Sequence, residues 1–154
     1  MFSSSSQRPG RRIQDESGFS LIELLVVILV ISILAAIAVP SFAAQKGKAQ
    51  DAQAKELART AETTAELIGT DNGGEYEHVS TTELNKYEHT IPIAAAGGAY
   101  LSGATSGKAG YSVTTKASDG DEFTITKTAT GEVTRTCASS VTKVGCAGAS
   151  TGSW

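Results

Sequence analysis

The chain has 154 residues, of which 40% are hydrophobic and 19% charged, and its formal net charge is −3. This length excludes a multidomain architecture and a large enzyme, because a domain ordinarily takes about 100 to 200 residues. The balance is mildly acidic and no block of lysine or arginine offsets it. Sequence-independent binding to nucleic acid or to anionic lipid surfaces is therefore disfavoured, since both depend on clustered positive charge.

A long apolar stretch occupies residues 19–39, after a polar N-terminal segment. As a helix that rises about 1.5 Å per residue, its 21 residues span about 31 Å, which matches the hydrocarbon core of a bilayer. Arg8, Arg11 and Arg12 precede the stretch, and the positive-inside rule keeps that end in the cytoplasm. The sequence therefore predicts one membrane-spanning helix, with the C-terminal part of the chain outside.

One acidic residue, Glu23, lies inside this stretch. A carboxylate in hydrocarbon costs about 2.5 to 3.5 kcal/mol near a helix centre and less near an end. A proteolytic cut between Gly18 and Phe19 would create an amine at Phe19, and this amine on a neighbouring subunit could pair with Glu23. Such a pair would set the register between apolar helices. The alternative is that Glu23 lies near the cytoplasmic headgroups, protonated or hydrated.

The residues at this junction carry a family resemblance. Gly18, Phe19 and Glu23, followed by the apolar run and then Pro40, closely resemble the N-terminus of type IV prepilins and of type II secretion pseudopilins. The resemblance implies that a membrane-embedded prepilin peptidase cuts after Gly18 and methylates Phe19, the new N-terminus. Glu23 and Pro40 are then expected to serve assembly. Pro40 lacks a backbone donor, so we also expect a kink or a loosened turn there.

The resemblance also implies a role and a set of partners. The chain would be a structural subunit and no enzyme, needing no cofactor, and it would form a homo-oligomeric helical filament through its apolar helix. Expected partners are the prepilin peptidase, an assembly ATPase and a membrane platform protein, with no nucleic acid. The precursor would cross the bacterial cytoplasmic membrane once, with its N-terminus in the cytoplasm, and the assembled form would be an extracellular pilus. A type II secretion or competence pseudopilus is the second possibility.

Helical periodicity continues beyond Pro40. Asp51 and Lys55 form a favourable pair four residues apart, and Gly69 with the turn residues 71–74 ends the helix. Small and apolar side chains recur at helical spacing and predict one buried stripe against a small sheet. The stripe consists of Ala54, Leu57, Ala58, Ala61, Ala65 and Ile68.

The C-terminal half predicts a small antiparallel sheet. Ser80 and Glu83 have capping-box spacing, which predicts a short helix, whereas residues 94–98 and 103–110 are interpreted as loop. Alternating residues predict three strands joined by turns at 118–121 and 130–131. Side chains expected to face the helix are Tyr111, Val113, Phe123, Ile125 and Val133, and those expected to face solvent are Thr114, Thr124, Thr126 and Thr134.

The predicted fold class is therefore α+β and pilin-like: a long N-terminal helix, half transmembrane and half amphipathic, packed on a small antiparallel sheet. Its organisation is a cytoplasmic leader at 1–18, a transmembrane and filament-core helix at 19–40, an amphipathic continuation at 41–69, and an extracytoplasmic sheet domain with a C-terminal disulfide loop at 70–154. The compact sheet and this loop favour a pilus subunit over a pseudopilin.

The disulfide expectation rests on Cys137 and Cys146, the two cysteines, which have eight residues between them. This is not the C-x-x-C spacing of redox or zinc sites, so a disulfide in an oxidising compartment is the simpler interpretation, with two free thiols as the alternative. Closing so short a loop stabilises a fold by about 2.5 to 3 kcal/mol in the chain-entropy model.

Motifs of catalysis give little support to an enzyme. No H-E-x-x-H motif and no phosphate-cradling loop occurs in the sequence. His78 and His89 have Glu75, Glu77 and Glu88 nearby and could bind a metal, but solvated loop side chains are the simpler interpretation.

A weak calcium candidate lies in the turn after residue 118. Asp119, Asp121 and Glu122 offer the oxygen ligands that Ca²⁺ prefers, and some secretion pseudopilins bind calcium in this domain. An Asp-Gly turn explains the same residues without an ion.

Two alternatives to a filament subunit stay open. The apolar run could be an ordinary secretory signal, cut after Ala44 among the small residues at 36–44, which would release a soluble binding protein or enzyme that begins near Gln45. The chain could also be a monomeric anchored domain, uncut at Gly18. The mature N-terminus distinguishes these possibilities.

Overall fold

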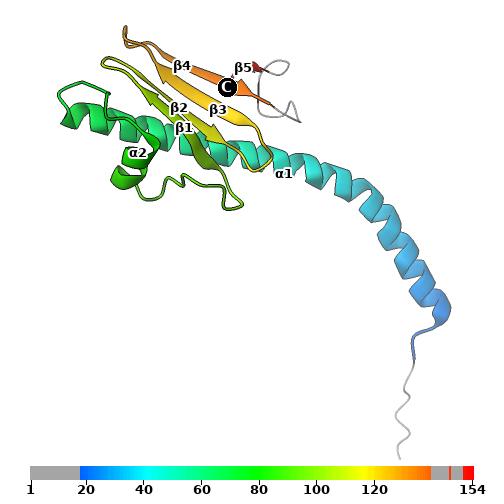
Figure 1. Ribbon diagram of the computed structural model, residues 1–154. Helices are drawn as coiled ribbons and strands as arrows, with labels where there is room; N and C mark the ends of the chain where they lie inside the picture. Colours follow the sequence, from blue (N-terminus) through cyan, green and yellow to red (C-terminus); the bar gives the residue numbers. More distant parts are fainter. Residues whose placement is uncertain (1–17, 140–145, 147–150) are drawn as a thin grey trace, which may run out of the picture. The chain divides into compact units, whose positions relative to one another are not determined.

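The computed structural model describes residues 18–139, 146 and 151–154, so the leader arginines lie outside the described residues. In this part of the chain, two helices and one five-stranded sheet are present (Figure 1). The helices are α1 (Leu21–Asp71) and α2 (Thr81–Tyr87). Contacts divide the chain into two compact units between Val39 and Pro40, and each unit is considered by itself.

The N-terminal unit contains the first part of α1. This part holds the apolar run, and among the described residues α1 is the helix long and apolar enough to cross a membrane. Every described residue from 18 to 42 is exposed, so no residue that the structure describes covers these side chains. Pro40 lies inside α1 as assigned, and the expected loosening of the helix there stays a prediction.

The remainder of α1 belongs to the second unit and carries the buried stripe. The spacing prediction is confirmed, because the alanines and Ile68 of the stripe are fully buried and only Leu57 is partly exposed. Alanine side chains are short, so the sheet can approach the helix backbone closely. Thr115 on the sheet accordingly donates a 2.8 Å hydrogen bond to the carbonyl of Ala54 on the helix.

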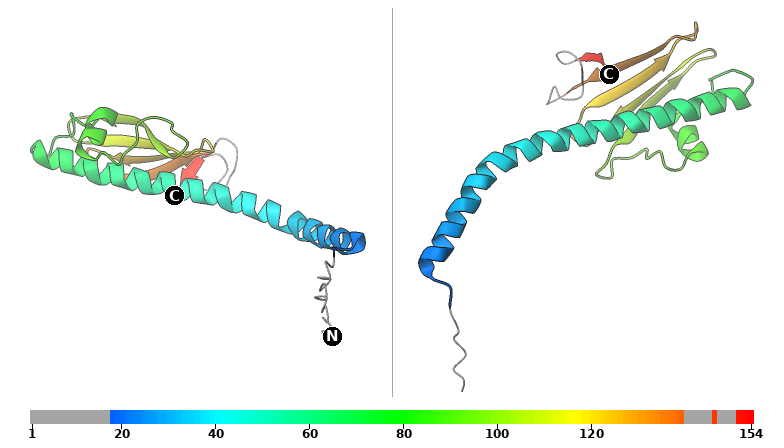
Figure 2. Two further views of the ribbon diagram at one scale, coloured as in Figure 1. Left: turned by 90° about the horizontal axis from the view of Figure 1, so that it is seen from below. Right: turned by 180° about the vertical axis from the view of Figure 1, so that it is seen from behind.

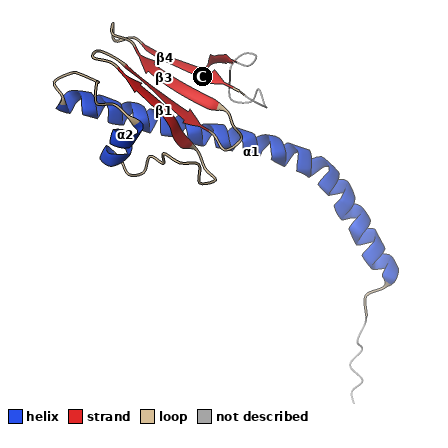
Figure 3. Ribbon diagram, viewed as in Figure 1, coloured by secondary structure: helices blue, strands red, loops and turns tan. Residues whose placement is uncertain are grey.

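The sheet is an antiparallel meander in the order β1-β2-β3-β4-β5 and lies along one side of this part of α1 (Figures 2 and 3). The strands are β1 (Tyr100–Ser106), β2 (Tyr111–Lys116), β3 (Glu122–Lys127), β4 (Val133–Ala138) and β5 (Thr151–Ser153). The predicted α+β arrangement of a long helix on a small antiparallel sheet is therefore confirmed.

Three strands follow the predicted alternation. Tyr111, Val113, Phe123 and Ile125 are buried against α1, as predicted. Val133 was expected to join them, but it is 37% exposed. The expectation was wrong because Val133 is the first residue of β4 and pairs with Lys127 at the end of β3, where the core is already finished.

Two strands were missed by sequence analysis. The expected loop at 103–110 overlaps β1, which pairs with β2 and has a register irregularity between Leu101 and Gly103. Leu101 is buried, whereas most of β1 is glycine, serine, alanine or threonine, so no apolar alternation marks it. β5 has three residues and pairs with the end of β4. Both are edge strands that depend on backbone pairing with a neighbour.

The helix ends follow their local signals. Ser80 caps α2 and its hydroxyl accepts a 3.2 Å hydrogen bond from the Glu83 backbone amide, as the capping-box spacing predicts. α1 ends at Asp71, and Gly74 donates a 2.7 Å hydrogen bond to the carbonyl of Gly69. Gly73 and Gly74 both have positive φ, a backbone conformation that residues with a Cβ rarely adopt.

Candidate functional site

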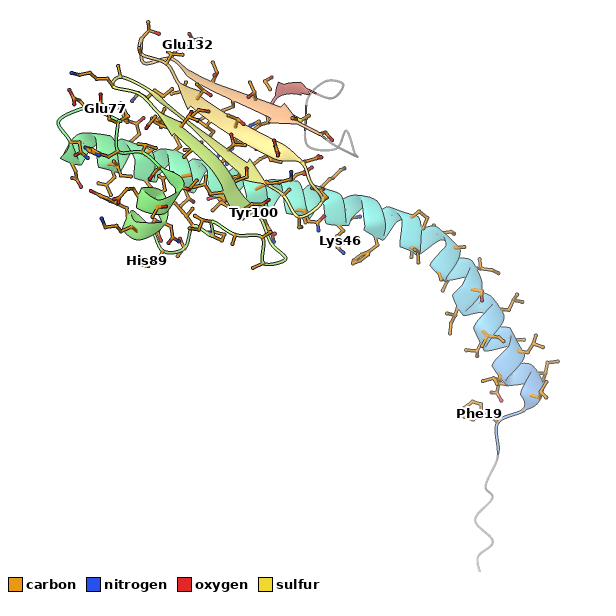
Figure 4. All side chains as sticks on the ribbon, in the orientation of Figure 1. Phe19, Lys46, Glu77, His89, Tyr100 and Glu132 are labelled. Atoms are coloured by element: carbon orange, nitrogen blue, oxygen red, sulfur yellow. A yellow bond between two sulfur atoms is a disulfide. The ribbon has the colours of Figure 1, made fainter. Side chains whose placement is uncertain are left out.

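The apolar segment, residues 19–39, presents large side chains that no described part of the chain covers. Figure 4 shows carbon side chains projecting from this part of α1, with Phe19 at its N-terminal end. Phe19 is 85% exposed, and the leucines, valines and isoleucines that follow are all at least 48% exposed. Exposed apolar patches of this extent mark contacts with lipid or with other protein surfaces. Such a contact is not made by the residues that the structure describes.

The predicted processing residues lie at the start of this segment. Gly18 is exposed, and a methyl group added at its α-carbon would meet no atom within 4 Å. The bond between Gly18 and Phe19 precedes α1 and is accessible, as a cleavage site must be. Glu23 is exposed in the first turn of α1 and forms no ion pair with any residue that the structure describes.

A second feature is a cluster of three carboxylates in the other unit. Asp51 on α1 lies with Asp119 and Asp121 of the β2–β3 turn, and one oxygen from each lies within 4.8 Å of the others. Among the described residues, this is the group of three or more metal-ligating side chains that the fold assembles. We call these residues the Asp51 cluster.

The β2–β3 turn places two members of the cluster. Gly120 has a positive φ of 102°, and its amide donates a 3.0 Å hydrogen bond to the carbonyl of Ala117. The amide of Ala117 in turn donates to the carbonyl of Asp121 over 2.8 Å, and the amide of Asp121 donates to Oδ1 of Asp119 over 3.3 Å. These bonds close the turn and bring both carboxylates to one side of it.

Asp51 is the most unusual member. It is 2% exposed, yet both of its carboxylate oxygens lack a hydrogen-bond partner, as does Oδ2 of Asp119. Burial, followed by the negative charges of Asp119 and Asp121, raises the pKa of Asp51 to about 6, although Lys55 acts in the opposite direction. Leaving a buried polar group unpaired is costly, so this carboxylate requires an explanation.

Asp121 is satisfied by a different route. It is fully buried, and the hydroxyl of Ser139, just after β4, donates to both of its carboxylate oxygens over 2.9 and 3.1 Å. The cluster therefore joins three parts of the fold: α1, the β2–β3 turn and the residue that follows β4.

The structure brings together only two of the three residues that were expected to bind calcium. Asp119 and Asp121 come together, whereas Glu122 turns away and forms a 3.0 Å ion pair with Lys116. The direction of Glu122 follows from strand alternation, since it begins β3 next to the buried Phe123. Sequence analysis assigned Asp51 only to a pair with Lys55. Its position on the same helical face as the stripe residue Ala54 is the signal that could have identified a buried acid.

A separate polar cluster surrounds Glu66 on α1. Its carboxylate accepts hydrogen bonds from Lys127 at 2.8 Å, from the Tyr76 hydroxyl at 2.8 Å and from the Tyr111 hydroxyl at 2.9 Å. Burial alone raises the pKa of Glu66, but these three donors outweigh it and the net pKa is lowered. The Glu66 carboxylate therefore has hydrogen-bond donors. Because these donors come from β2, β3 and the segment after α1, the cluster holds these three parts of the domain against the helix.

The remaining residues singled out from the sequence are the two cysteines, expected to form a disulfide, and the two histidines, considered as metal ligands. Cys137 and Cys146 form a disulfide, as expected. His78 and His89 are both exposed, and neither is part of a group of three metal-ligating side chains in the described part of the chain.

Comparison with known proteins supports the resemblance at the N-terminus. The family described as the prokaryotic N-terminal methylation motif matches residues 13–39. The chain is also similar to the fimbrial protein EcpC of Eikenella corrodens, with 33% identity over 89 residues. That alignment covers 54% of this chain and 58% of EcpC, so the chain spans little more than half of this relative. No solved structure matches the chain significantly. The resemblance to type IV prepilins is confirmed, and the fold is pilin-like.

Proposed function

We propose that the chain is a structural subunit of a type IV pilus. In this proposal it is inserted in the cytoplasmic membrane as a precursor, cleaved after Gly18, methylated at Phe19 and polymerised through the apolar segment. The observation that carries the proposal is the coincidence of the methylation motif with an apolar helix whose side chains stay exposed in the described part of the chain. The similarity to a fimbrial protein supports it further.

Assembly follows from the physics of the apolar segment. In the membrane its side chains are solvated by lipid, and the hydrophobic effect does not favour helix association there. Outside the membrane the same side chains would face water, at about 1.5 to 3 kcal/mol for each large residue left uncovered. A subunit that leaves the bilayer therefore needs other apolar helices around it. A bundle of such segments in the core of a filament provides that environment.

Glu23 gives the bundle a register in this proposal. Cleavage creates an α-amine at Phe19, and pairing this amine with Glu23 of a neighbouring subunit neutralises both charges where water is excluded. A charge pair is far more sensitive to position than contacts between aliphatic side chains. The pair would therefore favour one offset between adjacent helices.

The first test is the intact mass and N-terminal sequence of protein recovered from a sheared cell-surface fraction. The expected chain begins at methylated Phe19 and is two hydrogens lighter for the Cys137–Cys146 bond. A Gly18→Leu variant should remain uncut in the membrane, whereas Gly10→Leu, a leader glycine away from the cut, should be processed normally. A mature chain that begins near Gln45, or an uncut chain found only in membranes, would overturn the filament proposal.

The role of Glu23 is tested separately. Glu23→Ala should insert in the membrane and be cleaved normally, but should yield at least about tenfold fewer filaments, corresponding to a loss of about 1.4 kcal/mol in subunit association. Ser32→Ala is a matched control in the same segment, because the Ser32 hydroxyl already donates to the carbonyl of Ile28 within the helix. Equal filament yields from Glu23→Ala and the wild type would exclude the charge-pairing mechanism.

A pseudopilin of a secretion or competence system is the alternative within the same family. It shares the processing and the apolar helix, so the location of the polymer separates the two. Long filaments in the sheared surface fraction support a pilus subunit, whereas polymer confined to the cell envelope supports a pseudopilus.

A further inference from the structure

The Asp51 cluster has no role in the proposed function, and its geometry is unusual for a cluster that only stabilises the fold. Its three carboxylates lie within 4.8 Å of one another in an interior where like charges repel strongly. Asp51 and Asp121 are almost completely buried. Most buried carboxylates are paired with a cation or with several donors. Even Glu66, which is only partly buried in this same domain, accepts hydrogen bonds from three donors.

Asp51 provides a second, independent observation. Both of its oxygens are buried without a hydrogen-bond partner, and Oδ2 of Asp119 is equally without a partner. One oxygen of Asp51 lies within 4.8 Å of an oxygen of each of the two turn carboxylates. Buried carboxylate oxygens that lie close together and accept no hydrogen bond are suited to bind one cation, which would neutralise their charges. Three acceptor atoms in one place also exclude a simple explanation by one missing hydrogen bond.

The spacing of these atoms identifies the kind of cation. Oxygens bound to one Ca²⁺ lie about 2.3 to 2.6 Å from it, so any two of them are at most about 5 Å apart. The cluster satisfies this limit as it stands. Mg²⁺ demands a tighter octahedron and usually keeps several waters, so a site with three protein carboxylates suits Ca²⁺ better.

We propose that Asp51, Asp119 and Asp121 form a Ca²⁺ site that fastens the β2–β3 turn to α1. The ion takes one or more oxygens from each carboxylate, and water completes its coordination. Ser139 holds the Asp121 carboxylate in place from the residue after β4. Binding therefore ties together three segments of the domain that are distant in sequence.

Gly47 is consistent with this geometry. It lies one helical turn before Asp51, and a methyl group added at its α-carbon would lie 3.8 Å from Oδ2 of Asp119. The turn thus approaches the helix closely at this point.

The proposal is tested on the full chain in detergent micelles, freed of metal with a chelator and then titrated with CaCl₂ in a calorimeter. We expect one ion per chain, with an affinity in the range of extracellular calcium modules, about 10⁻⁴ to 10⁻³ M. In about 5 mM CaCl₂ the melting temperature should rise by about 5 to 10 °C. MgCl₂ at the same concentration, and NaCl at matched ionic strength, should give much smaller shifts.

Variants connect the response to the cluster. Asp51→Asn should lose the binding heat and the rise in melting temperature, and its melting temperature without metal should not fall below that of the wild type, because a buried charge is removed. Glu122→Gln is the matched control, since this neighbouring acid pairs with Lys116 and should leave the calcium response unchanged. Asp119→Asn, in the turn, provides a second cluster variant should Asp51→Asn not fold.

Four outcomes would overturn the proposal. They are a wild type with neither heat nor a shift in melting temperature, an equal response to MgCl₂ or to NaCl, an undiminished calcium response in the cluster variants, and loss of that response in Glu122→Gln. In the first case the carboxylates share protons instead of an ion. None of these measurements requires filament assembly, so their failure leaves the proposed pilus function untouched.

Discussion

The two parts of α1 bury different kinds of side chain in different places. Before Pro40 the helix carries leucine, isoleucine and valine on every face, and all of them are exposed. From Ala54 onward the helix buries mostly alanine, in one stripe under the sheet. A helix that is apolar all round requires an apolar environment on all sides, whereas a stripe requires only one packing partner. The second part packs on the sheet, whereas no described residue covers the first part.

This contrast separates side chains that the domain buries in its own core from side chains that stay exposed in the described part of the chain. The second unit has its own core, its disulfide and its polar clusters. The large side chains of the apolar segment are exposed instead. A substitution should therefore act on domain stability in the second unit and on insertion or assembly in the apolar segment.

The largest expected effect is a core truncation in the second unit. Phe123 is fully buried and contacts the Trp154 ring edge-on, with ring centroids 5.8 Å apart. Phe123→Ala should lower the free energy of unfolding by about 3 to 5 kcal/mol, through the lost burial and the cavity that it leaves. Thermal and chemical denaturation of the full chain in detergent micelles, followed by near-ultraviolet circular dichroism, measures this loss.

The matched change in the apolar segment is Leu29→Ala, at an exposed residue. It should alter the free energy of unfolding of the second unit by no more than about 0.5 kcal/mol. Comparable losses from the two truncations would mean that the apolar segment contributes to the stability of the domain and that the two regions are not independent.

A charge placed in the apolar segment should have the next largest effect. Val30→Lys, near the middle of the segment, should oppose membrane insertion by about 2.5 to 3.5 kcal/mol and abolish filament assembly. The protein remaining in carbonate-washed membranes measures this directly. Gln53→Lys, on an exposed face of α1 in the second unit, should insert like the wild type. If Val30→Lys were retained in membranes as fully as the wild type, the segment would not span the bilayer.

The smallest expected effect is the pH dependence that arises at Glu66. The donors around it, Lys127, Tyr76 and Tyr111, hold its folded pKa below the ordinary value of 4.5. A lowered folded pKa stabilises the fold fully above about pH 4.5, and this contribution is lost as the pH falls through the folded pKa. Because the Glu66 side chain is partly exposed, we expect about 1 kcal/mol or less.

Comparison with Glu66→Gln isolates this contribution from the other carboxylates. The difference in melting temperature between the wild type and Glu66→Gln should be greatest at neutral pH and should shrink as the pH falls below about 4.5. A difference that stays constant down to pH 3, or grows on acidification, would mean that the ionised form of Glu66 is not the one that the fold stabilises.

Local patterns in the sequence were sufficient for much of this molecule. The apolar segment, the stripe that begins at Ala54 and the cap at Ser80 follow from periodicity and from side-chain chemistry, which act between residues close in the chain. The three central strands follow from alternation, and the methylation motif is contiguous. Each of these features could be predicted because its cause lies within a few residues of it.

The tertiary structure decided what depends on residues distant in sequence. β1 is a strand because β2 offers it backbone partners, and its own side chains give no apolar alternation. Val133 is exposed because it is the first residue of β4 and lies beyond the end of the core. Asp51 joins Asp119 and Asp121 only when the sheet packs on α1, so the acidic cluster spans a helix and a turn, whereas the sequence suggested three neighbouring acids of the turn alone. Packing brings such groups together, and no local sequence pattern shows that residues so far apart in the chain will be neighbours in the fold.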